Sequence, residues 1–290
     1  MTYDAPIPVT TIRNNNFGDA LALPLVRFLT GNDAEHYDRL PIFGKRFSGI
    51  GSVAFLWTGH TLVWGSGVLD ERRTCEPGLP GMEFLAVRGP KTRAHLISKG
   101  YGDVPEVYGD PGIFAPAMYF PVLDFEKRYD IGIVCHHSDD VKRIAETMVR
   151  RRGTTFVFIS TADPCDIVMR RISQCRRICS SSLHGIVVAE AMGIPCSWFR
   201  ASSINDPFKF YDYFLGSGRS EDSVNMADLR GVPSVDFQSM SSLPKPTYDV
   251  DGMLDAFPLV LGICNDALVR IKDYFDNHPE IQLLERRPSI

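Results

Sequence analysis

The sequence predicts an α/β protein with two successive units, each organised around a parallel sheet. The first observation is strict alternation: between residues 129 and 199, short β-rich runs are separated by amphipathic helical runs, a pattern typical of parallel strands with helices on both faces. The second is that the first 120 residues share this plan of strand, polar turn and helix. The third is length, since 290 residues correspond to roughly two domains.

The first unit opens with a candidate strand at 8–12, a polar turn and an apolar helix at 20–30. Asp19 falls in the first turn of that helix, where a carboxylate stabilises the helix dipole. The alternative role is a general base or a hydroxyl-binding group, because the turn also follows a strand and lies at the mouth of the sheet.

Two further β-rich runs are expected as strands, at 52–56 and 61–64. The second ends in Gly65-Ser66-Gly67, and glycines just past a strand allow a ligand to approach the backbone closely. Such a turn is weak evidence alone, since most are only turns. The proline- and glycine-rich stretch 74–82 is expected to be a loop.

A buried strand at 84–87 leads into Arg88 and a helix at 91–99, with Pro90 suited to the first helical position. Arg88 therefore stands at the carboxyl end of a strand and beside a helix N-terminus, and together these features predict an anion site. A surface arginine is the alternative interpretation. Asp110 follows the next short strand-like run and is a candidate helix cap.

A proline-containing, charged linker at 120–128 separates the two units. The second unit then alternates strands and helices along its whole length, which is the clearest pattern in the chain. We expect strands at 129–135, 154–160 and 194–199, a strand ending at 177–179, and helices at 139–152 and 163–174.

The stretch 180–195 predicts a strand end, a sharp turn and a short helix. Ser182 is a natural N-cap, and Gly193 stands where a left-handed residue ends the helix. The turn carries His184, which can donate a hydrogen bond or a proton to an anion held at the helix N-terminus. The alternative is a histidine that only packs at a helix start.

Beyond residue 200 the pattern loosens. An aromatic-rich helix is expected from about 207 to 214, and its Lys209 is either a second cation near His184 or a solvent-facing lysine. Residues 220–247 are irregular and polar, and 252–277 are largely helical with an interruption at Pro258.

Composition excludes several classes. The net charge of −4 gives no reason to expect nucleic acid as a partner. Seven cysteines without a Cys-x-x-Cys pair are expected to be reduced thiols, and no spacing of metal ligands is visible, so we expect no metal. The N-terminal residues lack a signal-peptide pattern, and the longest apolar run is too short to span a bilayer.

Several short motifs together resemble the polysaccharide pyruvyl transferase family, in particular its ketal-pyruvate transferases of exopolysaccharide synthesis. Each motif is weak alone, and their order along the chain, over roughly residues 11–214, makes the set fairly specific. The matching segments are Asn14-Asn15-Asn16-Phe17-Gly18-Asp19-Ala20, Val63-Trp64-Gly65-Ser66-Gly67, Val87-Arg88-Gly89-Pro90, Gly109-Asp110-Pro111, Ser181-Ser182-Leu183-His184-Gly185 and Phe208-Lys209-Phe210-Tyr211-Asp212.

The resemblance implies two Rossmann-like domains in a GT-B-like arrangement with a helical C-terminal tail. The expected domains are 1–122 on the acceptor side, 128–216 on the donor side, and 217–290 as an irregular segment with helices packing back on the cleft. Catalytic roles would fall to His184, Arg88 and Asp19. Substrate-binding residues would be Asn16, Gly18, Gly65, Ser66, Gly67, Asp110, Ser182, Leu183, Gly185 and Lys209.

The resemblance further implies phosphoenolpyruvate as the donor substrate, a saccharide acceptor that is lipid-linked or polymeric, and no cofactor. Some relatives have an arginine where this chain has Ser182, so one cation of the donor site is missing here. The expected location is the cytoplasm, with peripheral association at the inner membrane face through basic clusters at 150–152 and 170–171. The alternatives are a nucleotide-sugar glycosyltransferase on the same architecture and a non-catalytic saccharide-binding protein.

Overall fold

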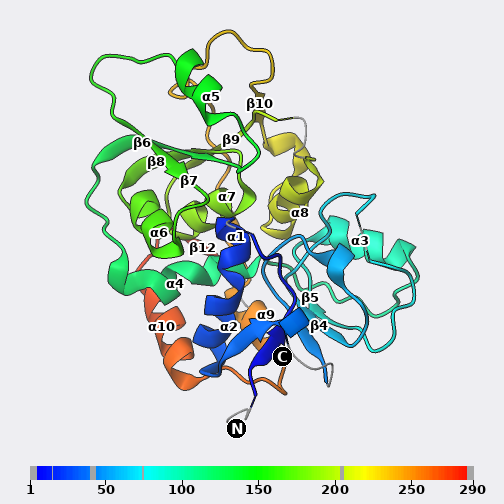
Figure 1. Ribbon diagram of the computed structural model, residues 1–290. Coiled ribbons are helices and arrows are strands. Elements are labelled where there is room, and N and C mark those ends of the chain that lie inside the picture. Colours follow the sequence, from blue (N-terminus) through cyan, green and yellow to red (C-terminus); the bar gives the residue numbers. More distant parts are fainter. Residues whose placement is uncertain (1–4, 15, 40–43, 74, 203–205, 286–290) are drawn as a thin grey trace.

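The computed structural model describes residues 5–14, 16–39, 44–73, 75–202 and 206–285. Within them, two parallel five-stranded sheets form the centres of two units, and this confirms the predicted α/β class. Figure 1 shows the first unit, in blue and cyan, below the second, in green and yellow, with helix α4 (Ala115–Tyr119) between them. Asn15, part of one predicted motif, lies outside the described residues.

The first sheet has the strand order β2-β1-β3-β4-β5. Helix α2 (Ala22–Thr30) connects its first two strands, and Leu25, Val26 and Leu29 at helical spacing bury its inner face. Gly31 then ends α2 in the left-handed conformation with a φ of 68°. The remaining elements are β1 (Ile7–Val9), α1 (Phe17–Ala20), β2 (Ala34–His36), η1 (Tyr37–Arg39), β3 (Arg46–Ser48), η2 (Ala54–Leu56), β4 (Thr61–Trp64), β5 (Glu83–Ala86) and α3 (Pro90–Ser98).

The second sheet has the order β10-β9-β8-β6-β7, and a helix follows each strand from β6 to β9. Its central strands are buried and rich in Ile, Val and Cys, as expected for strands covered on both faces. The elements are β6 (Tyr129–Cys135), α5 (Val141–Thr147), β7 (Phe156–Ser160), α6 (Cys165–Ser173), β8 (Cys175–Ser180), α7 (Leu183–Ala191), β9 (Cys196–Arg200), α8 (Phe208–Gly216), η5 (Glu221–Ser223) and β10 (Met226–Asp228).

Each sheet has a point where the direction of strand addition reverses. In the first sheet β1 lies between β2 and β3, and in the second β6 lies between β7 and β8. Open α/β sheets bind ligands at such a switch point, beyond the carboxyl ends of the strands. The segments that follow β1, β3, β6 and β8 are therefore the places to look for a site.

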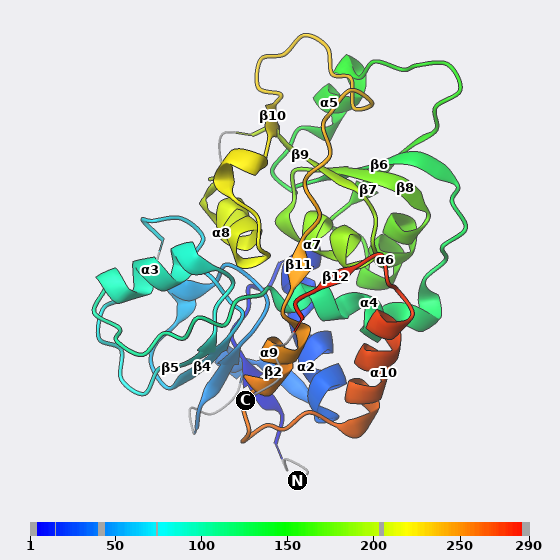
Figure 2. The same ribbon diagram turned by 180° about the vertical axis from the view of Figure 1, so that it is seen from behind.

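The C-terminal segment returns to the first unit. Figure 2 shows it in orange and red, running from the second unit down to α9 (Val250–Asp255) and α10 (Asn265–Asp276). The indole of Trp64 donates a hydrogen bond of 2.7 Å to the carbonyl of Met253, and α10 packs on α2 and α4. Strands β11 (Thr247–Tyr248) and β12 (Gln282–Leu283) pair with each other. These contacts place the C-terminal helices on the first unit.

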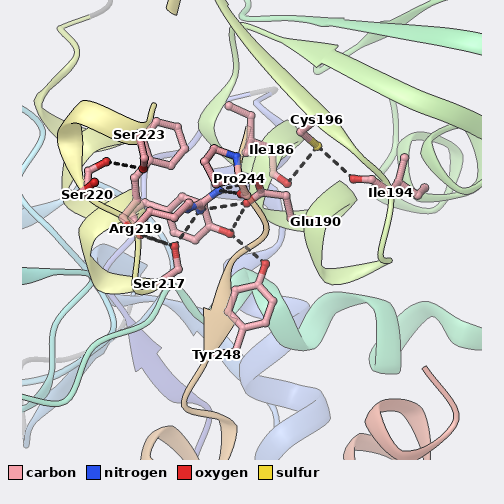
Figure 3. A network of polar contacts seen from close by, with 12 residues as sticks. Ile186, Glu190, Ile194, Cys196, Ser217, Arg219, Ser220, Ser223, Pro244 and Tyr248 are labelled. Carbon is pink, nitrogen blue, oxygen red and sulfur yellow. Dashed lines mark hydrogen bonds and ion pairs between the residues drawn. The ribbon is translucent and has the colours of Figure 1, made fainter. Parts of the chain in front are cut away.

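A buried polar network fastens the start of this segment to α7 (Figure 3). The Arg219 guanidinium donates to both carboxylate oxygens of Glu190, at 2.7 and 3.1 Å, and Tyr213 donates to the same carboxylate at 2.9 Å. Tyr248 closes the network through the hydroxyl of Tyr213 at 3.0 Å. Both charges are buried, so the network holds the 217–248 segment in one position.

Two of the expected elements differ in the structure. The run 52–56 is not a strand: Gly51 has a φ of 114°, which turns the chain after β3, and the 3-10 helix η2 follows. The helix expected at 139–152 ends at Thr147 because the next residues pair in extended form with another segment, Val149 donating to the carbonyl of Val235 at 2.7 Å. Strands β2 and β3 were not predicted.

No helix in the described part of the chain is both long and apolar enough to cross a membrane. All seven cysteines lie in the described part of the chain; none of them forms a disulfide bond there, and five are buried. Burial raises the pKa of Cys135 and of Cys175 to about 12, so these thiols are protonated at neutral pH and are poor nucleophiles.

Candidate active site

A cavity of about 800 Å³ opens where the carboxyl edges of the two sheets meet. Its walls come from segments that follow strands in both units, including the two switch points. The first unit contributes Ile12, Asn14, Asn16, Asp19, Ser52, Phe55, Leu69, Asp70, Arg72 and Arg73. The second unit contributes His136, His137, Ser182, Leu183, His184, Arg200, Asp206 and Lys209.

Carboxylates and an amide line the wall formed by the first unit. Asp19 is 8% exposed, and its Oδ2 accepts a hydrogen bond of 2.8 Å from Nδ2 of Asn16. Asp70 accepts the backbone N–H groups of Arg72 and Arg73, both at 2.9 Å. This turn directs the two arginines toward the cavity rim, where their side chains are 89% and 67% exposed.

The wall formed by the second unit begins at the N-terminus of α7. Ser180 fixes the turn, because its hydroxyl accepts the N–H of Ser182 at 3.0 Å and donates to the carbonyl of Ser182 at 2.9 Å. Ser182 occupies the predicted N-cap position, but within the described residues its hydroxyl makes no capping bond. The unpaired amides of the first helical turn and this hydroxyl are therefore available to a ligand.

His184 lies between the two units. Its Nε2 is 3.6 Å from Oδ2 of Asp110, a residue of the first unit. On the other side Gly18 contacts the ring: a Cβ added there would lie 1.9 Å from Nδ1 of His184, so only glycine is accommodated. Burial alone raises the pKa of Asp110, but His184, Arg88 and the Gly112 amide outweigh it and leave that pKa below its usual value.

Lys209 brings an unpaired cation to the cavity. The side chain is about nine-tenths buried, and its ammonium forms no ion pair or hydrogen bond within the part of the chain that the structure describes. Burial, reinforced by the Arg88 guanidinium, lowers the pKa of Lys209 to about 8, against the opposing effect of Asp19 and other carboxylates. A buried cation without a counter-ion destabilises the empty protein and favours an anionic ligand.

His136 and His137 follow β6 and are cavity residues that the sequence analysis did not single out. Burial, together with Lys209, His137 and His184, lowers the pKa of His136 to about 3, so this ring is neutral at physiological pH. Its backbone N–H donates to Asp139 at 3.0 Å and to Ser181 at 2.9 Å, which ties the ends of β6 and β8 together. Their position directly after a strand is the sequence signal that could have identified these two histidines.

The structure places Arg88 away from the cavity, contrary to the anion site expected at this turn. The side chain is fully buried, and its Nε donates to Oδ2 of Asp212 at 3.0 Å. The other two nitrogens donate to Ser52 Oγ and, at 2.6 Å, to the carbonyl of Val68. Because the side chain is fully buried and each nitrogen donates within the protein, Arg88 does not line the cavity in this structure.

The remaining predicted glycines and serine lie behind the cavity wall. Gly65 has a φ of 84°, and a Cβ there would lie 2.5 Å from Pro111 Cδ. Ser66 is fully buried and donates to the carbonyl of Gly51 at 2.9 Å. A Cβ at Gly67 would lie 2.6 Å from the Arg88 guanidinium, and one at Gly185 2.6 Å from Ser180 Oγ. Close packing therefore explains the three glycines.

The assembled cavity has a distinct chemistry on each side. The second unit offers cations, the neutral imidazole of His136 and helix amides, which suit an anion, whereas the first offers oxygens that accept hydrogen bonds from hydroxyl groups. His184, backed by a carboxylate, is the group suited to proton transfer. No cluster of three or more potential His, Cys, Asp or Glu metal ligands occurs among the described residues.

Comparisons with known proteins agree with this chemistry. No solved structure matches the chain. The succinoglycan biosynthesis protein ExoV of Rhizobium meliloti (strain 1021) is 28% identical over 209 residues, which cover 69% of this chain and 61% of that protein. Uncharacterized protein L143 of Acanthamoeba polyphaga mimivirus is 28% identical over 253 residues, covering 81% and 84%. The family model described as polysaccharide pyruvyl transferase matches residues 16–203, and the chain belongs to that family.

Proposed function

We propose that this protein transfers pyruvate from phosphoenolpyruvate to two hydroxyl groups of one sugar, forming a pyruvate ketal. The observation that carries the proposal is Lys209, a nearly buried cation that forms no ion pair among the described residues, in a cavity that also holds His184 and the N-terminus of α7. Phosphoenolpyruvate carries a phosphate and a carboxylate, and either group can pair with this cation. Family membership supports the reaction class.

The donor is proposed to lie against the second unit. Lys209 and the α7 amides hold one of its anionic groups, and Arg200, at the end of β9, borders the same wall. Arg72 and Arg73 approach from the rim of the first unit, where exposed arginines attract an anion before it enters. These cations take the place of the arginine that some relatives have at the position of Ser182.

The saccharide acceptor is proposed to lie against the first unit. Asp19, Asn16 and Asp70 present carboxylate and amide groups that bind sugar hydroxyls. Phe55, which is 36% exposed at the cavity, offers an apolar face beside them. This division assigns residues 1–122 to the acceptor and 128–216 to the donor, and the two sheets then work as the two domains of a GT-B-like enzyme.

The chemistry follows from this placement. His184 delivers a proton to the methylene carbon of the enol, which becomes a methyl group, and C2 gains oxocarbenium character. One sugar hydroxyl bonds to C2 while Asp19 accepts its proton. A second hydroxyl then bonds to C2 and gives its proton to the deprotonated His184, which restores the acid. The bond from C2 to the phosphate oxygen breaks, and inorganic phosphate leaves with the proton held by Asp19. One phosphate is released for each ketal formed.

The test is incubation of the protein with phosphoenolpyruvate and a panel of pyruvate-free glycans, both free and lipid-linked. We expect phosphate release that depends on acceptor, and a glycan whose mass has increased by one pyruvate ketal. Release of a nucleoside diphosphate from a sugar nucleotide, without phosphate release from phosphoenolpyruvate, would contradict the proposal and favour a glycosyltransferase. Saccharide binding without turnover of either donor would favour a binding protein.

We also propose that the acceptor is lipid-linked and that the protein meets it at the inner face of the membrane. Arg150, Arg152 and Arg170 are exposed, although neighbours in both clusters are paired within the protein, Arg171 with Asp163 at 2.6 Å. Attachment through such residues weakens as salt screens the charges. We expect the protein to bind anionic vesicles at low salt and to leave them in high salt. Absence of binding at low salt would contradict this role.

A further inference from the structure

We propose that Asp110 is the positioning residue for His184: it holds the imidazole with Nε2–H toward its carboxylate, so that Nδ1 is the atom that delivers the proton. This rests on the proposed function, in which His184 is the acid. The two residues come from different units, Asp110 from the carboxyl edge of the first sheet and His184 from that of the second. The acid is thus assembled only where the units meet.

The geometry shows two unsatisfied groups that face each other. Asp110 is fully buried, and its Oδ1 accepts the Gly112 N–H at 2.9 Å. Its Oδ2 and Nε2 of His184 are both buried, and among the described residues neither has a hydrogen-bond partner. They lie 3.6 Å apart, slightly beyond hydrogen-bond length. Such contacts in an empty enzyme shorten when substrate binds.

The fold fixes the ring between two glycine contacts. A Cβ at Gly18, in α1, would lie 1.9 Å from Nδ1 of His184, and one at Gly112, in η3 (Pro111–Phe114), 3.7 Å from its Cδ2. The short segment before Asp110 pairs with β5 through Tyr108 and Val87, so the carboxylate is carried by the sheet. These contacts hold the imidazole ring beside the Asp110 carboxylate.

Charged groups lie on two sides of the His184 imidazole, the buried side and the side that faces the cavity. On the buried side, Asp110 is the carboxylate that faces Nε2. Burial raises its pKa, but His184, Arg88 and the Gly112 amide together lower that pKa below its usual value. Toward the cavity, Lys209 of α8, neutral His136 after β6 and Asp19 of α1 approach. A carboxylate on the Nε2 side stabilises the imidazolium, and the proton that leaves is the one on Nδ1. Asp110 stays ionised throughout.

The kinetic test compares Asp110→Asn with a matched control, Asp249→Asn. Both aspartates cap a short helix by accepting a glycine N–H, at 2.9 Å for Asp110 and 2.8 Å for Asp249, but only Asp110 faces His184. We expect Asp110→Asn to lower kcat by about 10²- to 10⁴-fold with a donor KM within about threefold. The alkaline limb of the kcat–pH profile should move to lower pH. Asp249→Asn should change neither kcat nor that profile.

A second measurement decides the assignment without turnover. In ¹⁵N-histidine-labelled protein, we expect the shifts of neutral His184 to report the proton on Nε2, and Asp110→Asn to shift it toward Nδ1. The proposal is overturned if the wild type carries the proton on Nδ1, if the shifts are unchanged by Asp110→Asn, or if that variant keeps near-native kcat. Should phosphoenolpyruvate prove not to be a donor, the proposed function fails while the ¹⁵N result still tests the Asp110–His184 contact.

Discussion

His184 is the residue on which the proposed chemistry depends most directly. His184→Gln keeps a hydrogen-bond donor of similar length but cannot deliver a proton, so we expect turnover to fall by at least about 10²-fold while phosphoenolpyruvate still binds. Steady-state kinetics and calorimetric titration of the donor measure the two effects separately. His278→Gln, which lies just after α10 and does not line the cavity, is the control. A glutamine variant with near-native turnover at saturating donor would rule out the acid role.

Lys209 is predicted to weaken the fold while it strengthens donor binding. Burial lowers its pKa from 10.5 to about 8, so the unfolded chain binds more protons than the folded protein between these values, and stability rises with pH across that window. Lys209→Met should therefore stabilise the empty protein at pH 7, by up to about 3 kcal/mol, and remove the gain in stability between pH 8 and 10.

The same substitution should sharply weaken donor binding, and in the wild type the donor KM should rise above about pH 8 as Lys209 loses its proton. Urea unfolding at pH 7 and pH 10 and donor titration check both parts. The interpretation of Lys209 as a buried cation that binds an anionic ligand would be contradicted by either of two results. One is a Lys209→Met protein no more stable than the wild type at pH 7, and the other is a variant that binds the donor as tightly as the wild type.

At the scale of elements, we predict that α1 positions the imidazole ring of His184 because Gly18, near the start of this helix, has no side chain. A Cβ at Gly18 would lie 1.9 Å from Nδ1 and 2.5 Å from Cε1 of His184, so Gly18→Ala must displace the ring or the helix. A misplacement of about 1 Å can cost about 10²-fold in rate, and overpacking costs about 1–3 kcal/mol of stability.

The measurements are kcat and thermal unfolding, with Gly102→Ala as the control. Gly102 has no atom within 4 Å of an added Cβ, so alanine there should leave both quantities unchanged. If Gly18→Ala retains full activity, α1 does not position the ring.

Elements with strong local signals were predictable from the sequence. The strands at 61–64 and 129–135 agree with the structure at both ends, and Gly193, just past helix α7, has the predicted left-handed conformation with a φ of 67°. Strands β2 and β3 are three residues long and carry too short a pattern to detect. The early end of α5 could not be predicted either, because its cause is a pairing with residue 235, far along the chain.

The candidate site was predictable where it follows a strand and starts a helix. Asn16, Asp19, Ser182, Leu183, His184 and Lys209 were singled out from sequence, and the structure brings them to one cavity. Residues such as Asp70 and Arg200 lie at turns without a helical or motif signal. Arg88 shows what the sequence alone could not predict. Its position after a strand predicted contact with an anion, and the anion in the structure is the carboxylate of Asp212, 124 residues further along the chain.

At the scale of the whole molecule, the carboxylate of Asp212 joins the two units. Asp212, on α8, accepts Arg88 Nε with one oxygen and the backbone N–H of Thr92 with the other, so α8 of the second unit caps helix α3 of the first. Two glycines permit the approach: a Cβ at Gly89 would lie 1.9 Å from the Asp212 carbonyl oxygen, and one at Gly216 2.3 Å from that of Arg88. Because Arg88 also donates to Ser52 in the cavity wall, this joint connects the wall of the first unit to helix α8 of the second.

The Arg88–Asp212 pair leads to a prediction about stability. The same variants also test whether Arg88 binds the donor. Removing one partner of a buried ion pair leaves the other charge uncompensated, so Asp212→Leu should lower the free energy of unfolding by about 3–5 kcal/mol. The double variant Arg88→Met/Asp212→Leu should recover most of that loss, because apolar side chains replace both charges. Denaturant unfolding of the four members of this cycle gives the coupling energy directly.

An exposed pair across the same joint supplies the control. Lys91 of α3 and Glu221 lie 2.9 Å apart with side chains 32% and 47% exposed, and breaking this pair should cost about 0–1 kcal/mol. If Asp212→Leu costs no more than Glu221→Gln, the buried pair does not hold the units together. The double variant then decides the remaining question about Arg88. Retained donor affinity means that Arg88 acts only within the joint, whereas affinity lost in a protein of restored stability means that the guanidinium also contacts the donor, which the empty cavity does not show.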